Sequence, residues 1–115
     1  MITLFTTTKI FAGIFKIIQT NALNSWRTIS SNIQIIIIGD SEGGKEAADL
    51  INAEFIPEVE CSSEGVPLIN SLFSIAQSRA KYPIIAYVNA DILLPPNLLE
   101  VIFLLQKFRS NFLAV

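Results

Sequence analysis

Four consecutive isoleucines at residues 35–38 constrain the fold of this chain more than any other part of its sequence. A strand with one face in water would alternate apolar with polar side chains. An unbroken apolar run is instead typical of a parallel strand that helices cover on both faces. Hydrophobic residues make up 51% of the 115 residues and charged residues only 16%, which agrees with burial on two faces. The run therefore predicts an α/β architecture, and a chain of this length supplies one core.

Short apolar segments alternate with segments of helical periodicity along the whole chain. Strands are predicted at residues 2–6, 34–38, 55–56 and 84–88. The clearest helix places Ile18, Ala22, Trp26 and Ile29 on one apolar face, with Trp26 as a core residue and Gln19 on another face. Further helices are predicted around residues 47–51, 69–80 and 98–105. This order predicts a Rossmann-like, mostly parallel sheet of four or five strands with helices on both faces.

Polar side chains stand at the exits of three predicted strands: Thr6, Thr7 and Thr8 after the first, Asp40 after the second, and Asn89 and Asp91 after the last. In open α/β sheets, ligands bind at the carboxyl ends of the strands, where the strand order reverses. If the first strand lies between the other two, these side chains converge on such a crevice. Asp91 is then the best single candidate for chemistry. Two structural alternatives stay open, because Asp91 can simply turn the chain and Asp40 can cap a helix.

The residue inventory excludes several classes of site. The chain has no histidine and a single cysteine, so disulfides within the chain, cysteine zinc clusters and histidine-based catalysis are excluded. Any metal must therefore bind oxygen ligands. The glycines after residue 38 match neither the dinucleotide nor the phosphate-loop fingerprint, which disfavours a dinucleotide oxidoreductase. The net charge of −2 disfavours nucleic acid as the partner.

The two least regular parts of the sequence give two further expectations. Residues 58–67 are polar and rich in turn formers, and they are predicted to be the longest segment without regular structure. Residues 112–115 are apolar and are predicted to begin another strand. An uncovered apolar strand edge promotes association, so we expect self-association or a partner chain at this edge. No apolar run reaches the roughly 20 residues that span a bilayer, and no basic leader opens the chain, so we expect a cytoplasmic protein without a transmembrane segment.

The order of elements resembles the nucleotide-binding half of a glycosyltransferase of the GT-A fold, near the family-2 type. Asn89, Ala90 and Asp91 stand in the place of that family's Asp-x-Asp motif. The resemblance implies a divalent cation, Mn²⁺ or Mg²⁺, that Asp91 holds against the diphosphate of a nucleotide sugar. Asn89 departs from the motif, because a neutral amide oxygen binds a cation more weakly than a carboxylate does.

The same resemblance implies nucleotide-binding roles for residues at the other strand exits. Thr6 and Thr8 stand where the family's first strand meets the nucleoside, and Asp40 stands where an acid usually meets the base. Thr7, between the two threonines, is a further nucleotide-binding candidate. Asn70 resembles the asparagine of the family's Ala-Arg-Asn stretch, although isoleucine replaces the arginine before it. Asn89 completes the set of nucleotide-binding candidates.

Residues 1–115 would thus form one domain that binds a nucleotide-diphospho-sugar and that stops before the acceptor-binding half. The catalytic base stays unassigned, because in this family it commonly belongs to that second half. We therefore expect a transferase-like domain that binds the donor and that transfers the sugar only when it is completed. The alternative is a non-catalytic α/β nucleotide-binding or interaction module in which both aspartates are turn residues.

Overall fold

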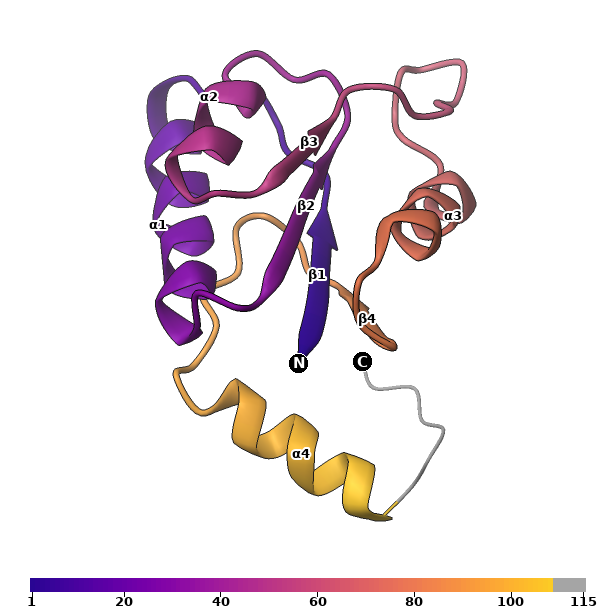
Figure 1. Cartoon of the computed structure of the whole chain (residues 1–115). Helices are drawn as coiled ribbons and strands as arrows, with labels where there is room; N and C mark the ends of the chain where they lie inside the picture. Colours follow the sequence, from indigo (N-terminus) through magenta and orange to yellow (C-terminus); the bar gives the residue numbers. More distant parts are fainter. Residues whose placement is uncertain (109–115) are drawn as a thin grey trace.

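The computed structural model describes residues 1–108, in which strands and helices alternate strictly (Figure 1). The elements are β1 (Ile2–Thr6), α1 (Gly13–Ile29), β2 (Gln34–Ile38), α2 (Gly44–Leu50), β3 (Glu54–Ile56), α3 (Ile69–Arg79), β4 (Ile84–Tyr87) and α4 (Leu98–Phe108). The predicted Rossmann-like α/β architecture is confirmed. The strand predicted to begin at residues 112–115 lies outside the described residues.

The four strands form one parallel sheet in the order β3-β2-β1-β4. Leu4 of the central strand β1 pairs with Ile35 on one side and with Ala86 on the other. The chain adds β2 and β3 on one side of β1 and then returns across the sheet to add β4 on the other. The predicted reversal of strand order therefore exists, and it lies at β1.

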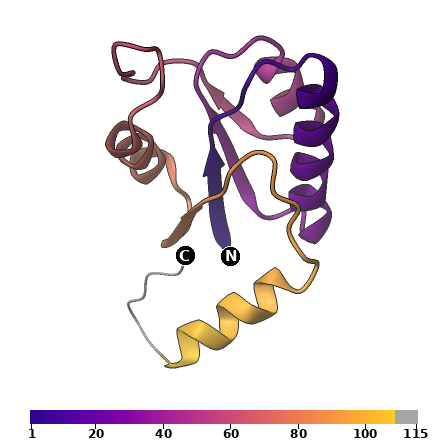
Figure 2. The same cartoon turned by 180° about the vertical axis from the view of Figure 1, so that it is seen from behind.

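Helices cover both faces of the sheet (Figures 1 and 2). Ile35 and Ile37 of β2 point into the core under α1 and α2, together with Leu23 and Trp26 of α1. The alternate side chains of β2, Ile36 and Ile38, point into the second core under α3. There they meet Phe5 of β1 and Leu72 and Ala76 of α3. The unbroken isoleucine run is thus explained by two apolar layers that share one strand.

The buried face of α1 differs from the predicted one at its start. Trp26 is fully buried, as predicted. Gln19 is also buried, whereas Ile18 is exposed. The reason is the loop that leads into α1: the Gln19 side chain accepts a hydrogen bond from the Lys9 backbone N–H (2.7 Å) and donates one to the Lys9 carbonyl (3.1 Å). An amide side chain satisfies both backbone groups, which no aliphatic side chain can do.

After β4 the chain crosses to the face that α1 covers. The indole N–H of Trp26 donates to the Ile92 carbonyl (2.8 Å), and the Leu94 N–H donates to the Ser25 hydroxyl (3.1 Å). The helix α4 then lies beyond the amino-terminal ends of the strands (Figure 1), at the end of the sheet opposite to the strand exits. Among residues 1–108, no helix combines the length and apolar character needed to cross a membrane.

Candidate functional site

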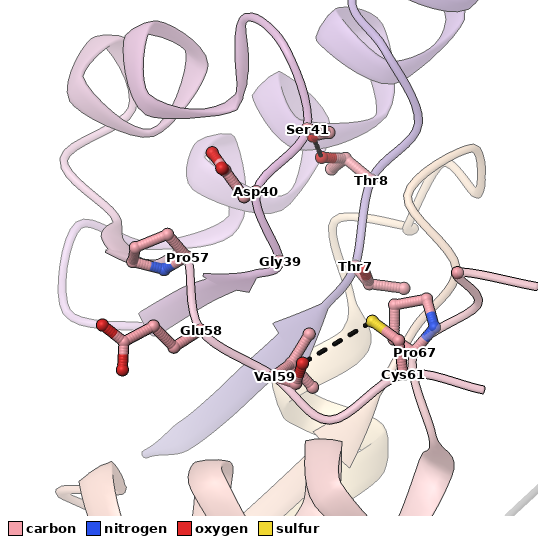
Figure 3. Close-up of a pocket in the computed structure, with 11 residues that line it drawn as sticks. Thr7, Thr8, Gly39, Asp40, Ser41, Pro57, Glu58, Val59, Cys61 and Pro67 are labelled. Carbon is pink, nitrogen blue, oxygen red and sulfur yellow. Dashed lines mark hydrogen bonds between the residues drawn. The ribbon is translucent and has the colours of Figure 1, made fainter. Parts of the chain in front are cut away.

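A cleft of about 510 Å³ opens at the carboxyl ends of three neighbouring strands (Figure 3). Its lining comes from the exits of β1, β2 and β3 and from the loop that follows β3: Thr7, Thr8, Gly39, Asp40, Ser41, Pro57, Glu58, Val59, Cys61, Gly65 and Pro67. The cleft therefore occupies the edge of the sheet where the sequence predicts a ligand.

Short contacts join the three strand exits into one frame. The hydroxyls of Thr8 and Ser41 are 2.6 Å apart and hydrogen-bonded, which ties the loop after β1 to the loop after β2 (Figure 3). The Gly39 N–H donates to the Ile56 carbonyl (2.7 Å), which ties the β2 exit to the end of β3. Gly39 has a φ of +110°, and a Cβ there would lie 3.0 Å from the Thr7 hydroxyl oxygen. Glycine is thus required both by the backbone angle and by the close approach of Thr7.

The loop that follows β3 contains neither a helix nor a named strand and is the longest such segment among residues 1–108, so the prediction of a long segment without regular structure at residues 58–67 is confirmed. Backbone hydrogen bonds nevertheless close a turn within it. An antiparallel bridge pairs Cys61 with Pro67, and the Ser62 N–H donates to the Val66 carbonyl (2.8 Å). The Gly65 N–H returns to the Ser62 carbonyl (2.9 Å), and the φ of +84° at Gly65 closes the turn. These hydrogen bonds give a tight turn that forms one wall of the cleft.

The cleft carries negative charge. Asp40 and Glu58 are its two ionisable carboxylates, and Figure 3 shows both on the opposite side of Gly39 from Thr7 and Cys61. The residues that line it include no lysine and no arginine. A phosphate-bearing ligand would therefore need a bound cation to offset repulsion. Among residues 1–108, no group of three acidic or cysteine side chains lies close enough together to hold a metal ion.

Three of the predicted site residues line the cleft. These are Thr7, Thr8 and Asp40. The alternative that Asp40 caps α2 is wrong, because the N-cap is Gly43 and no side chain caps that helix. Thr6 is buried, and its hydroxyl donates to the Thr7 carbonyl (3.3 Å), so it does not line the cleft.

The other predicted residues lie outside the cleft lining. Asn70 is exposed in the first turn of α3, where its side-chain oxygen accepts from the Ser71 N–H (3.0 Å). Asn89 and Asp91 are exposed in a turn that the Ile92 N–H closes on the Asn89 carbonyl (3.1 Å). The strand β4 that leads into this turn lies on the other side of β1 from β2, and neither Asn89 nor Asp91 lines the cleft.

The charge of Asp91 acts on the hydroxyl of Tyr87. Burial raises the pKa of the Tyr87 hydroxyl, and the Asp91 carboxylate raises it further by repelling the phenolate. Tyr87 in turn packs edge-on against Phe5 of β1, with ring centroids 5.5 Å apart. Asp91 is thus held close to the end of the sheet while it stays open to solvent.

Glu58 lines the cleft, although it was not among the predicted site residues. Glu58 follows β3 by two positions, as Asp40 follows β2 by two, so the strand-exit rule applies equally to both. Val59 and Cys61 reach the cleft only because the turn after β3 folds back, which residue types alone did not indicate. No protein-family model and no curated protein sequence matches this chain.

Proposed function

We propose that this chain binds the diphosphate of a nucleotide sugar, with Mn²⁺ or Mg²⁺, as the donor-binding part of a glycosyltransferase. The observation that carries the proposal is the position of the cleft, at the exits of β1 and β2 beside the reversal of strand order. Its volume of about 510 Å³ falls within the roughly 300–1,000 Å³ of small-molecule sites. Nucleotide sugars as substrates agree with the cytoplasmic location expected from the sequence.

The nucleoside would lie in the cleft against the exits of β1 and β2, which the Thr8–Ser41 hydrogen bond holds together. The Asp40 carboxylate can accept hydrogen bonds from ribose hydroxyls or from a base N–H, and it has no capping role that would occupy it. The hydroxyls of Thr7 and Thr8 offer further donors and acceptors on the other side of Gly39 (Figure 3). Thr8 is already positioned by its hydrogen bond to Ser41.

The diphosphate would then extend past the β1 exit toward Asp91. In this arrangement a single carboxylate and the phosphate oxygens share the cation, which is the coordination that Mg²⁺ commonly adopts at nucleotides. Asn89 supplies at most a neutral oxygen. The cation would bind weakly without the nucleotide, in keeping with the lack of a three-acid cluster among residues 1–108. When bound, such a cation neutralises the charge that develops on the departing diphosphate.

Isothermal titration with uridine and guanosine diphosphates, with and without Mn²⁺, tests this proposal. The unaltered chain should bind at least one of them, and more tightly with Mn²⁺. Asp91→Asn should weaken binding in Mn²⁺ by about tenfold or more, the size of effect seen when metal-site residues are lost. Asp40→Asn should weaken binding with and without the cation. Glu100→Gln, an exposed acid-to-amide change on α4, is the matched control and should change nothing.

Two results would count against the proposal. If no nucleoside diphosphate binds, the donor-binding function is wrong. If the diphosphate binds with the same affinity to Asp91→Asn, and Mn²⁺ has no effect, the chain is instead a cation-independent nucleotide-binding module. A large fall in the melting temperature of Asp91→Asn would show that Asp91 serves to stabilise the turn after β4.

A further inference from the structure

Two carboxylates stand at neighbouring strand exits in the cleft. The register of the sheet pairs Ile38 of β2 with Ile56 of β3. Asp40 and Glu58 follow these paired residues by two positions each, so they leave the sheet at the same level. The hydrogen bond from the Gly39 N–H to the Ile56 carbonyl (2.7 Å) holds the two exits together. Both acids line the cleft and lie on the same side of Gly39 (Figure 3).

The two carboxylates are available to a ligand. Within residues 1–108, neither forms an ion pair, and no lysine or arginine lines the cleft beside them. An ionised carboxylate only accepts hydrogen bonds. The exits of β2 and β3 therefore suit a ligand that presents hydrogen-bond donors to this side of the cleft.

The strand order places the acids in the order in which the parts of a nucleotide follow one another. In the order β3-β2-β1-β4, Glu58 follows the outermost strand, Asp40 follows its neighbour, and Asp91 follows β4 beyond β1. Neighbouring strands lie about 4.8 Å apart, which is close to the spacing of base, ribose and diphosphate along a nucleotide. A diphosphate that extends toward Asp91, as proposed above, leaves the ribose to Asp40 and the base to Glu58.

The β3 exit also offers apolar surface to a planar base. Pro57 and Val59 flank Glu58 in the sequence, and both line the cleft. Pro67 lines it as well, and its bridge to Cys61 fixes it in the folded-back turn. Apolar contacts hold the ring of any base, whereas a few polar groups determine which one is accepted. At this exit the polar group is the Glu58 carboxylate.

We propose that Glu58 selects guanine, so that the sugar donor of this domain is a guanosine diphosphate sugar. Guanine presents two adjacent donors, N1–H and the exocyclic amino group, which match the two oxygens of one carboxylate. Uracil presents a single N–H between two carbonyl oxygens, which a carboxylate repels. Adenine and cytosine place an acceptor nitrogen beside their amino groups. This inference rests on the proposed function and adds the nucleotide that the cleft accepts.

Isothermal titration with three diphosphates in Mn²⁺ tests the selection. The unaltered chain should bind guanosine diphosphate about tenfold or more tightly than uridine diphosphate, the discrimination expected of a two-bond contact to a base. Inosine diphosphate keeps N1–H and lacks the amino group, so its affinity should fall between the two.

Glu58→Gln tests the residue itself. Glutamine keeps one acceptor oxygen but sets an amide N–H₂ against the donors of guanine, so the preference for guanosine over uridine diphosphate should fall by about tenfold. Glu60→Gln is the matched control, because it makes the same charge change at an exposed acid that does not line the cleft. It should keep the preference. Equal melting temperatures by circular dichroism will show that both variants are folded.

The place of the ribose is tested separately. The unaltered chain should bind 2′-deoxyguanosine diphosphate more weakly than guanosine diphosphate, because Asp40 loses a hydroxyl donor. Asp40→Asn should reduce this difference by about threefold or more and should keep the preference for guanine over uracil.

The possible failures of the inference and of the proposed function are distinct. Equal affinities for guanosine and uridine diphosphates, or a preference that Glu58→Gln keeps, would overturn the inference and leave the proposed function standing. Mn²⁺ that binds without a nucleotide, and that Glu58→Gln releases, would make the two acids a cation site and also overturn the inference. If no nucleoside diphosphate binds, the proposed function and the inference are both wrong.

Discussion

Arg27 stabilises the end of the sheet opposite to the cleft, and no acid within residues 1–108 forms an ion pair with it. Its guanidinium donates to five backbone carbonyls that follow α1 and α2: Ser30, Ser31, Ile33, Ile51 and Asn52. Partial burial lowers the pKa of this side chain from its ordinary value. One planar group thus ties together the two segments that leave α1 and α2, with Nη1 shared among three of the five carbonyls.

Removal of this group should therefore destabilise the fold. Arg27→Met should lower the free energy of unfolding by about 2–4 kcal/mol, because several carbonyls lose a charged donor. Arg27→Lys should recover less than half of the loss, since an ammonium cannot reach all five acceptors. Urea denaturation measures both. Arg79→Met, at an exposed site on α3, is the matched control, and an equal loss there would contradict the role of Arg27.

Asp91 and Tyr87 offer a pH-dependent test of the turn after β4. The folded pKa of Tyr87 is raised above its unfolded value of about 10 by burial and by Asp91. The resulting stabilisation is fully present below that unfolded value, and it is lost as the pH rises through the folded pKa. Tyr82→Phe leaves Tyr87 as the single tyrosine. In this background, ultraviolet titration measures the pH at which half of Tyr87 is ionised. Asp91→Asn should lower this midpoint, and Asp40→Asn should leave it unchanged. An unchanged midpoint in Asp91→Asn would show that the Asp91 carboxylate does not lie near Tyr87.

At the scale of elements, the junction between β2 and α2 depends on Gly43 as well as on Gly39. Gly43 is the N-cap of α2 with a φ of +83°, and a Cβ there would lie 2.7 Å from the Cβ of Phe11. Gly65 has nearly the same φ of +84°, but nothing lies within 4 Å of its Cβ position. The two glycines thus share the same backbone requirement and differ in their surroundings.

This pair separates backbone strain from steric overlap. Gly65→Ala should cost about 1 kcal/mol of stability, the price of a left-handed backbone angle in alanine. Gly43→Ala should cost about 2–4 kcal/mol, because Phe11 must also move. Thermal unfolding of both variants measures the difference. Equal losses would show that the approach to α1 is not packed against this loop.

The sequence predicts the regular elements better than the loops between them. The isoleucine run and the helical stripe at Trp26 mark buried faces, because burial leaves a periodic apolar pattern. Gln19 breaks that pattern, since it is buried by hydrogen bonds to Lys9, ten residues earlier in the chain. The loop at residues 58–67 was predicted to be rich in turns and without regular structure, but the backbone hydrogen bonds that close its turn depend on a pairing that turn-forming residues do not reveal.

At the scale of the whole molecule, the strand order decides which predicted site residues meet. Thr7, Thr8 and Asp40 were far apart in sequence and line one cleft, because β1 and β2 are neighbours. Asp91 follows β4 on the other side of β1, so its place depends on how the chain turns after the strand. The apolar pattern identifies the strands, but their order was only a condition of the predicted site, and the path of that turn depends on distant contacts such as the one between Trp26 and Ile92.

The most direct test of the proposed function is to locate a bound nucleoside diphosphate by amide NMR of the isotope-labelled chain. Uridine or guanosine diphosphate with Mg²⁺ should shift the amides of the cleft, and replacement of Mg²⁺ by Mn²⁺ should broaden the nearest ones. We predict broadening at residues 39–41 and 89–92, with the amides of α4 unaffected. Broadening confined to α4 or to the exposed acids of α2, or no shift in the cleft at any nucleotide concentration, would contradict the account.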